Sequence, residues 1–443
     1  MSHTQIDNCY DSHVHWQATG QNATRLLLHH LQSAGGIRGC EISQAHFLGD
    51  WLVGFGWDNN RWQDQTYPTK DVLDELFPDH PVSFSRADGH AAWVNSKALK
   101  LIGVLDEQGQ VKNIPEMSGG RIVVDEQGKP TGILIDLAKS MVDQLIPEPD
   151  SNQVRSSLLQ GVQTFNRAGF THIRDVSCSE IQFDETCHLF EAGLLTLAVE
   201  QYFSADDPQD FDKALHLAKR ARAENVPLVR AVGLKIYYDG ALGSEGALIS
   251  ADYPSGSGMG LELLNRSELQ NLMKLTWENK FDIAIHTIGD EAVHRVVVAA
   301  EELWTQGYKG HLHLEHVEML RPETAKKMTG RPITCHIQPC HWLSDRRWLG
   351  EKLGDLERFV FPWRLLQESE VAFDFGSDSP IEEASLRTNL LALDESAVQG
   401  VPPLLGSALD YHSHPDKAWV PNTFSQFKEG ELLSVVFKGT HLF

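Results

Sequence analysis

The 443-residue sequence lacks several features that would define whole classes of protein. It has no run of eighteen apolar residues, which a membrane-spanning helix would need, so we do not expect a membrane protein. Basic residues are few: 38 Lys and Arg stand against 61 Asp and Glu, and the net charge is −23. A chain this acidic repels phosphate groups. Neither nucleic acid nor an anionic membrane is therefore an expected partner.

Cysteine is also scarce, with six in the chain and no Cys-x-x-Cys pair. This number is far below that of a disulfide-stapled domain, and the missing pair argues against a zinc ribbon or a redox dithiol. The opening residues MSHTQIDNCYDSHVHW hold neither the basic nor the apolar segment of a secretory signal. We therefore expect a soluble protein of the reducing cytoplasm.

What the sequence does contain is a regular alternation of β-rich runs and amphipathic helical stretches, such as DEAVHRVVVAAEELWTQ at 290–306. This alternation indicates parallel βα units. The expected strands number eight, as a (β/α)8 barrel requires. They cover residues 7–15, 170–176, 196–203, 229–238, 281–288, 311–318, 333–338 and 371–377.

Residues 60–150 interrupt this rhythm. They include a hairpin pattern, RIVVDEQGKPTGILID, with a Gly-Lys-Pro turn. We expect residues 1–443 to form a single barrel, with an inserted subdomain at about 60–150 that follows the first strand and covers the barrel mouth. A second, Gly-rich insertion at 239–260 has the composition of a mobile loop over a site.

The first candidate site residues are His13 and His15, in the motif Asp-Ser-His-Val-His. Residues i and i+2 of a strand point to the same face, so both rings project together at the carboxyl end of the first expected strand. That end is the catalytic face of a barrel, and two imidazoles there can converge on one cation. A lone His-x-His is a weak signal.

His286, His316 and Asp378 each lie near the carboxyl end of another expected strand. His311 and His313 compete with His316. Because His313 is out of phase with His316, we expect only one of these parities to face the barrel axis, and we choose His316. For Asp378 the alternative is an ordinary helix N-cap, a role that Ser379 could take instead.

Lys235, in GLKIYYDG, lies within a barrel-strand run. Burying an ammonium without a compensating partner costs free energy, so a lysine at this position indicates a specific role. Its amine could form a Schiff base or take up CO2 to give a carbamate, an anion able to bridge two cations. The alternative is a strand-end lysine whose amine reaches solvent. Together the candidates fall on expected strands 1, 4, 5, 6 and 8, all at the same end.

At this point the sequence resembles the amidohydrolase superfamily, and more narrowly amidohydrolase family 3, which includes N-substituted formamide deformylases. The resemblance runs in the family's order from residue 11 to residue 380. Its segments are DSHVHW, GFGWDNNRW, SRADGHAAWVNSKAL, TGILIDLA, KIYYDGALGS, IHTIGDEA, LEHVE, IQPCHWLSD and FGSDSP.

The resemblance implies a metal-dependent hydrolase on a (β/α)8 barrel. Its implied metal ligands are His13, His15, Lys235 as a carbamate, His286, His316 and Asp378. It also implies that Asp88 and His90 line the substrate side, and His341, after the seventh strand, is a further candidate to face substrate.

The sequence departs from the family at both ends. Members usually carry a longer segment before His-x-His and a Gly-Lys-x-Ala-Asp segment near the C-terminus, which together build a small β-sandwich. We therefore expect this sandwich to be lost or vestigial. The barrel surface it would cover needs another cover, and a homo-oligomer is one way to supply it.

The expected chemistry is hydrolysis of a C–N bond in a small amide, an N-formyl amine or an N-acyl amine. Two divalent cations, with zinc expected, would activate water. Asp378 would carry the proton to the leaving amine, and His90 or His341 would hydrogen-bond the oxyanion. Three alternatives stay open. They are a mononuclear hydrolase or deaminase, a Schiff-base lyase using Lys235, and a barrel that binds ligand without turnover.

Overall fold

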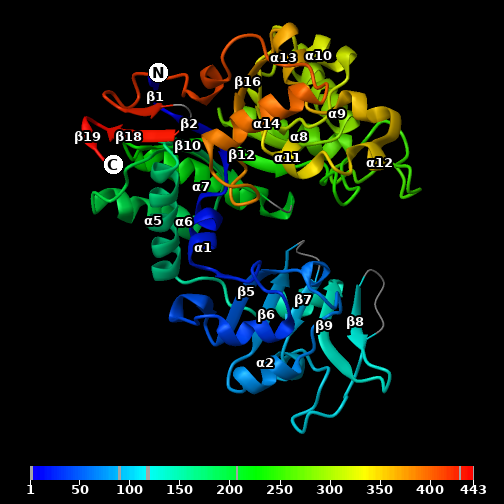
Figure 1. Cartoon of the computed structure of the whole chain (residues 1–443). Coiled ribbons are helices and arrows are strands. Elements are labelled where there is room, and N and C mark those ends of the chain that lie inside the picture. The colour runs from blue at the N-terminus through cyan, green and yellow to red at the C-terminus, as the bar shows by residue number, and fades with distance from the viewer. Residues whose placement is uncertain (1–2, 88–90, 116–119, 206–207, 429–430, 443) are drawn as a thin grey trace. The chain divides into compact units, whose positions relative to one another are not determined.

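The computed structural model describes residues 3–87, 91–115, 120–205, 208–428 and 431–442. The chain divides into two compact units. The first comprises Met1–Gly20 together with Val154–Phe443, and the second comprises Gln21–Gln153 (Figure 1). In the part of the chain described, no helix has both the length and the apolar character needed to cross a membrane.

The first unit is built on an eight-stranded sheet in which every paired neighbour is parallel, and this confirms the predicted (β/α)8 barrel. Each strand falls within two or three residues of its expected range. The strands are β2 (Tyr10–Val14), β10 (His172–Cys178), β11 (Ala198–Ser204), β12 (Val229–Tyr237), β13 (Asp282–Thr287), β14 (Leu312–His316), β15 (Ile333–Ile337) and β16 (Ala372–Phe375).

Helices cover the outside of the barrel because their apolar positions recur at helical spacing. Val293, Val296, Val297 and Ala300 form one buried stripe of α9. The helices of this part of the chain, of which α11 lines the carboxyl end of the barrel instead of its outside, are α1 (Trp16–Thr24), α5 (Ser151–Arg167), α6 (Glu180–Glu191), α7 (Phe211–Glu224), α8 (Arg266–Glu278), α9 (Asp290–Thr305), α10 (Pro322–Met328), α11 (His341–Asp345), α12 (Leu349–Leu353), α13 (Trp363–Glu368) and α14 (Leu386–Val398).

The first and last barrel strands meet at their carboxyl ends and close the barrel there. Val14 and Ser379 form a parallel bridge. The backbone N–H of Asp378 donates to the carbonyl of His13 at 2.9 Å, and that of His15 donates to Ser379 at 2.8 Å. The buried Asp11 carboxylate accepts from both the backbone N–H and the hydroxyl of Ser377. This closure sets His13 and Asp378 side by side.

A buried ion pair crosses the barrel interior. Arg174 of β10 and Glu315 of β14 are both fully buried, and two guanidinium nitrogens donate to the two carboxylate oxygens at 3.0 and 2.7 Å. The guanidinium also stacks on the ring of Tyr202, 4.0 Å from its centre. Burial alone would raise the pKa of Glu315, but the charges of Arg174 and His336 and a hydrogen bond from His13 hold it well below 4.5.

The two ends of the chain combine into one small antiparallel sheet, in which β1 pairs with β17 (Figure 1). Phe427 and Phe437 of this sheet lie in one buried cluster with Phe165 and Phe170 of the barrel unit. The sheet therefore covers part of the barrel surface. Its strands are β1 (His3–Asp7), β17 (Phe424–Lys428), β18 (Glu431–Phe437) and β19 (Thr440–His441).

The second unit has its own sheet and its own buried core. The hairpin expected from Gly-Lys-Pro is present, with β8 and β9 antiparallel. We expected the insertion at about 60–150, and the compact unit observed between β2 and β10 is Gln21–Gln153. Its elements are β3 (Leu26–Leu27), β4 (Phe47–Leu48), β5 (Trp51–Trp57), β6 (Val82–Arg86), β7 (Ala91–Val94), β8 (Gly120–Val124), β9 (Pro130–Asp136), α2 (Asp71–Leu76), α3 (Ser96–Leu101) and α4 (Leu137–Asp143).

Arg174→Met is expected to lower the free energy of unfolding by about 3–5 kcal/mol, because it leaves the buried Glu315 carboxylate without a partner. Adding Glu315→Gln removes this unpaired charge, and the double variant should recover part of the lost stability. Urea unfolding followed by circular dichroism measures both values. A loss below about 1 kcal/mol for Arg174→Met would show that the ion pair does not hold the barrel together.

The contribution of Glu315 is also expected to depend on pH. Its pKa in the folded chain lies below its usual value of 4.5, so its stabilisation is complete above that pH and declines as the pH falls below it. The stability difference between the wild-type chain and Glu315→Gln should therefore narrow in acid. A difference that stays constant from pH 7 down to about 3 would contradict the depressed pKa.

Candidate metal centre

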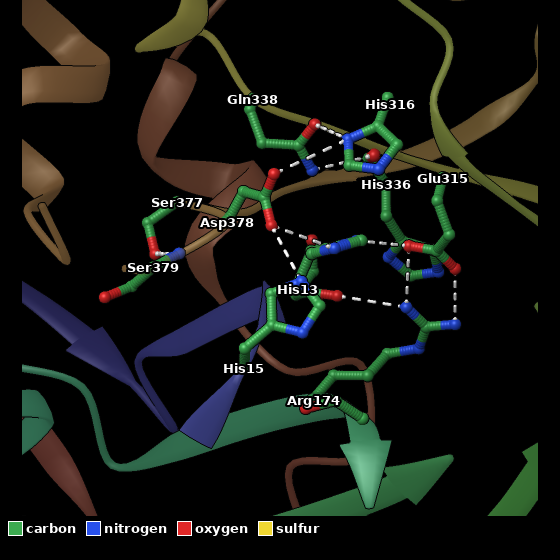
Figure 2. Close-up of polar contacts among 12 residues, drawn as sticks. His13, His15, Arg174, Glu315, His316, His336, Gln338, Ser377, Asp378 and Ser379 are labelled. Atoms are coloured by element: carbon green, nitrogen blue, oxygen red, sulfur yellow. Dashed lines mark hydrogen bonds and ion pairs between the residues drawn. The ribbon is translucent and has the colours of Figure 1, made fainter. Parts of the chain in front are cut away.

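Three buried side chains converge at the carboxyl end of the barrel: His13 from β2, His316 from the end of β14, and Asp378 after β16. One potential ligand atom from each lies within 4.8 Å of the others. All three are at most 5% exposed. Figure 2 shows the two imidazoles and the carboxylate turned toward one another, with His15 beside them. Imidazole nitrogens and a carboxylate oxygen are the donors that divalent zinc prefers.

The orientation of His13 is set by Glu315. Its Nδ1 lies 2.6 Å from a Glu315 carboxylate oxygen, which can only accept, so Nδ1 carries the proton and Nε2 presents a lone pair. That Nε2 lies 3.2 Å from Oδ1 of Asp378, and neither atom has a hydrogen-bond partner in the described chain. Two buried, unpaired donor atoms facing each other in this way fit a cation between them.

His316 reaches the site through an unusual backbone conformation. Its φ is +73°, outside the β region, and this breaks the alternation of side chains along β14. Our expectation that only one parity faces inward was therefore wrong. Glu315 and His316 are adjacent, yet both turn to the barrel interior, where His316 Nδ1 lies 2.9 Å from the Gln338 amide oxygen.

His286 of β13 lies beside His316, with ring centres 4.5 Å apart. Its Nε2 is 3.4 Å from the carbonyl of Gly240 and 3.8 Å from Asp239. Burial, and then the nearby charge of Lys235, lower the pKa of His286 to about 3. The ring is therefore neutral at physiological pH, which is the form that ligates metal.

Lys235 of β12 is 1% exposed, so the lysine expected to be buried is buried. Its Nζ lies 3.9 Å from the centre of the Tyr237 ring. Within the described chain this ammonium makes no ion pair with a carboxylate. The cost of burying it thus remains to be offset by something that binds in the cavity.

Asp378 also has a positive φ, +58°. Its Oδ1 is 3.2 Å from His15 Nε2 as well as from His13 Nε2. Burial opposes ionisation, but the adjacent imidazoles, first of all His13 and then His15, hold the pKa of Asp378 well below 3.8. The next helix, α14, is capped by Ser385, so Asp378 is not the helix cap that it resembled in the sequence.

His341 begins α11 on the far side of Asp378. Its Nδ1 is 2.9 Å from a Glu318 carboxylate oxygen, and its Nε2 is 3.6 Å from Asp378 Oδ2. Burial is outweighed by Glu318 and Asp378, which raise the pKa of His341 to about 9. The other two residues expected on the substrate side, Asp88 and His90, lie outside the described residues.

These side chains share one cavity of about 380 Å³. Its wall includes His15, Lys235, His286, His316, His341 and Asp378. His13 lies behind them, buried against Glu315. The residues predicted on strands 1, 4, 5, 6 and 8 are therefore brought together, as their common position at strand ends indicated.

Sequence reasoning missed the residues that support this site. Four such residues were not singled out. Glu315 contacts His13, and Arg174 in turn contacts Glu315. Gln338 contacts His316, and Glu318 contacts His341. A signal for two of them was present. Arg174 and Glu315 are charged residues inside apolar strand runs, the same argument that selected Lys235.

Comparison with known proteins places this geometry in a family. A sequence model of the Amidohydrolase family matches residues 10–394. A Bacillus subtilis protein named as an amidohydrolase, YtcJ, is 30% identical over 84% of this chain and 69% of its own length. An N-substituted formamide deformylase of Arthrobacter pascens is 25% identical over 75% of this chain and 62% of its own.

Among solved structures, an uncharacterized metal-dependent hydrolase from Pyrococcus furiosus superposes with a TM-score of 0.70. It is 23% identical, and the match covers 88% of this chain and 76% of that one, which shows a shared fold. Because the family match spans most of the barrel and includes His13, Lys235, His286, His316 and Asp378, the chain belongs to the amidohydrolase family.

Proposed function

We propose that this chain is a metal-dependent hydrolase that cleaves the C–N bond of a small amide, an N-formyl amine or an N-acyl amine. The observation that carries the proposal is the buried group of His13, His316 and Asp378, whose ligand atoms lie within 4.8 Å of one another in a cavity that also holds Lys235 and His286. The name of the Arthrobacter relative, an N-substituted formamide deformylase, supports this bond type.

The donor atoms present suit two divalent cations, and zinc suits this set of imidazoles and carboxylates. His13, His15 and Asp378 would hold one cation, and His286 and His316 the other. Lys235, as its carbamate, would join them: its neutral amine adds to CO2, and one proton leaves. The resulting anion removes the isolated buried ammonium, which is the unfavourable feature of this cavity.

When bound, such cations polarise the substrate carbonyl and lower the pKa of water to about 7, which makes hydroxide available at neutral pH. The chain's own residues do the rest. Asp378 is ionised and its oxygens face the cavity, so it accepts a proton from the attacking water and passes it to the leaving amine nitrogen. His341, held by Glu318, presents its Nε2, which has no hydrogen-bond partner in the described chain, to the carbonyl oxygen as that oxygen gains charge.

A mononuclear hydrolase or deaminase is the second candidate. The tight group of potential ligands in the described chain contains three residues, His13, His316 and Asp378, which is enough for one cation. This alternative needs neither the carbamate nor the second cation. The number of bound ions separates the two functions.

Metal analysis of the purified chain is expected to give about two zinc ions per chain, and dialysis against a chelator should abolish amide hydrolysis until zinc returns. Lys235→Ala should lower the metal content, because the bridging anion is lost. Elemental analysis by mass spectrometry checks each value. One ion per chain, unchanged in Lys235→Ala, would favour the mononuclear candidate, and no ion in either protein would contradict metal dependence.

Asp378→Asn is expected to keep the fold and lower kcat by about 10²–10⁴, because the amide cannot carry the proton. Asp374→Asn is the matched control, since this aspartate lies on β16, four residues before Asp378, and does not line the catalytic cavity. Turnover is measured by amine release from N-acyl and N-formyl amines, with metal content determined in parallel. Wild-type turnover in metal-loaded Asp378→Asn would remove this aspartate from the mechanism.

A further inference from the structure

The Gly-rich segment that follows β12 is anchored to the carboxyl end of the barrel. We call its first part, residues 240–248, the cavity loop. Three residues of this loop line the catalytic cavity: Ala241, Leu242 and Gly243. The loop folds back on itself, because the backbone N–H groups of Gly246 and Ala247 both donate to the carbonyl of Ala241, at 2.9 and 3.1 Å. Whatever fixes this loop therefore also fixes part of the cavity wall.

Asp239, the residue just before the loop, fixes it with a single carboxylate. This side chain is 1% exposed. Its Oδ2 accepts from the backbone N–H groups of Leu248 and Gly289, both at 2.9 Å, and its Oδ1 accepts from that of Ile288 at 3.0 Å. Leu248 ends the cavity loop, whereas Ile288 and Gly289 follow β13, the strand that carries His286. One carboxylate thus joins the loop to the ends of two neighbouring barrel strands.

The packing around Gly289 reinforces this junction. A Cβ atom at position 289 would lie 2.0 Å from the carbonyl oxygen of Leu248, so only glycine leaves room for the loop. The same carbonyl accepts from the backbone N–H groups of Glu291 and Ala292, at 3.2 and 3.1 Å, in the first turn of α9. The cavity loop is therefore held against the residues that directly follow His286.

This junction determines which nitrogen of His286 carries the proton. The Nε2 of His286 lies 3.4 Å from the carbonyl oxygen of Gly240 and 3.8 Å from Oδ1 of Asp239. Both oxygens belong to groups that accept hydrogen bonds, so in the neutral ring Nε2 carries the proton and Nδ1 keeps the lone pair. A histidine that binds metal through one nitrogen commonly donates from the other to such an oxygen.

We propose that Asp239 is a positioning residue for His286. By joining the cavity loop to the end of β13, it holds the carbonyl of Gly240 against Nε2 of His286 and leaves Nδ1 as the nitrogen that ligates a cation. Asp239 does not line the catalytic cavity, so it acts through His286 and not on the substrate. This inference rests on the proposed function, in which His286 holds one cation.

A carboxylate is needed for this role because both of its oxygens are in use. In Asp239→Asn one oxygen becomes an NH2 group, which can only donate and would face at least one of the three backbone N–H groups. The matched control is Asp290→Asn. Asp290 is also fully buried, accepts from the backbone N–H of Ser250 in the same Gly-rich segment at 3.0 Å, and lies 3.2 Å from Arg321. It is absent from the cavity lining.

The first experiment measures the ring nitrogens of His286 directly. The metal-free chain is labelled with 15N-histidine, and the NMR signals of His286 are assigned by their loss in His286→Gln. We expect the proton on Nε2 in the wild-type chain and in Asp290→Asn, and a mixture of the two neutral tautomers in Asp239→Asn. A proton on Nδ1 in the wild-type chain, or an unchanged tautomer in Asp239→Asn, overturns the inference.

The second experiment measures zinc affinity by competition with a chromophoric chelator. In Asp239→Asn the dissociation constant of the most weakly bound zinc should rise about 10–100-fold, whereas in Asp290→Asn it should stay near the wild-type value. Urea unfolding shows how much stability each variant loses. An unchanged zinc affinity in Asp239→Asn, or an equal loss in both variants, would mean that Asp239 only stabilises the fold, and this overturns the inference.

The two measurements also separate failure of this inference from failure of the proposed function. A wild-type chain that binds no zinc contradicts metal-dependent hydrolysis, and the ring spectra still decide whether Asp239 sets the tautomer of His286. If Asp239→Asn does not fold, the wild-type spectrum remains as the test, because a proton on Nδ1 is incompatible with the inferred role of the Gly240 carbonyl.

Discussion

The ion pair between Arg174 and Glu315 is the constraint on which the site depends. The guanidinium and the carboxylate are both fully buried, so removing either one would leave the other as an unpaired charge in the barrel interior. The same carboxylate accepts from Nδ1 of His13. One side chain therefore balances a charge in the barrel interior and decides which nitrogen of His13 faces the cavity. The stability of the barrel and the geometry of the site share this group.

Much of the barrel could be predicted because its signals are local. Apolar runs of strand length alternating with amphipathic helices give eight strands, and polar residues at strand ends place the candidate ligands at one face. The local rule failed at His316, where a positive φ turns the ring inward against the alternation of β14. No pattern of residue types reveals such a backbone angle. Asp88 and His90 stay predictions, since they lie outside the described residues.

Other parts were beyond sequence reasoning because the partners are far apart along the chain. β1 pairs with β17, so His3 lies opposite Lys428. No residue pattern within either strand indicates this pairing. The second unit begins at Gln21, earlier than expected, because its first strands, β3 and β4, are two residues long and give no periodic signal.

The closure of the barrel between β2 and β16 has a consequence for biosynthesis. The backbone of His13 bonds to that of Asp378, which leaves the ribosome 365 residues later. A nascent chain thus exposes His13 and His15 long before the strand that completes their surroundings exists. During translation these histidines therefore lack their final neighbours. A cation that bound to them at this stage would be held by an incomplete set of ligands.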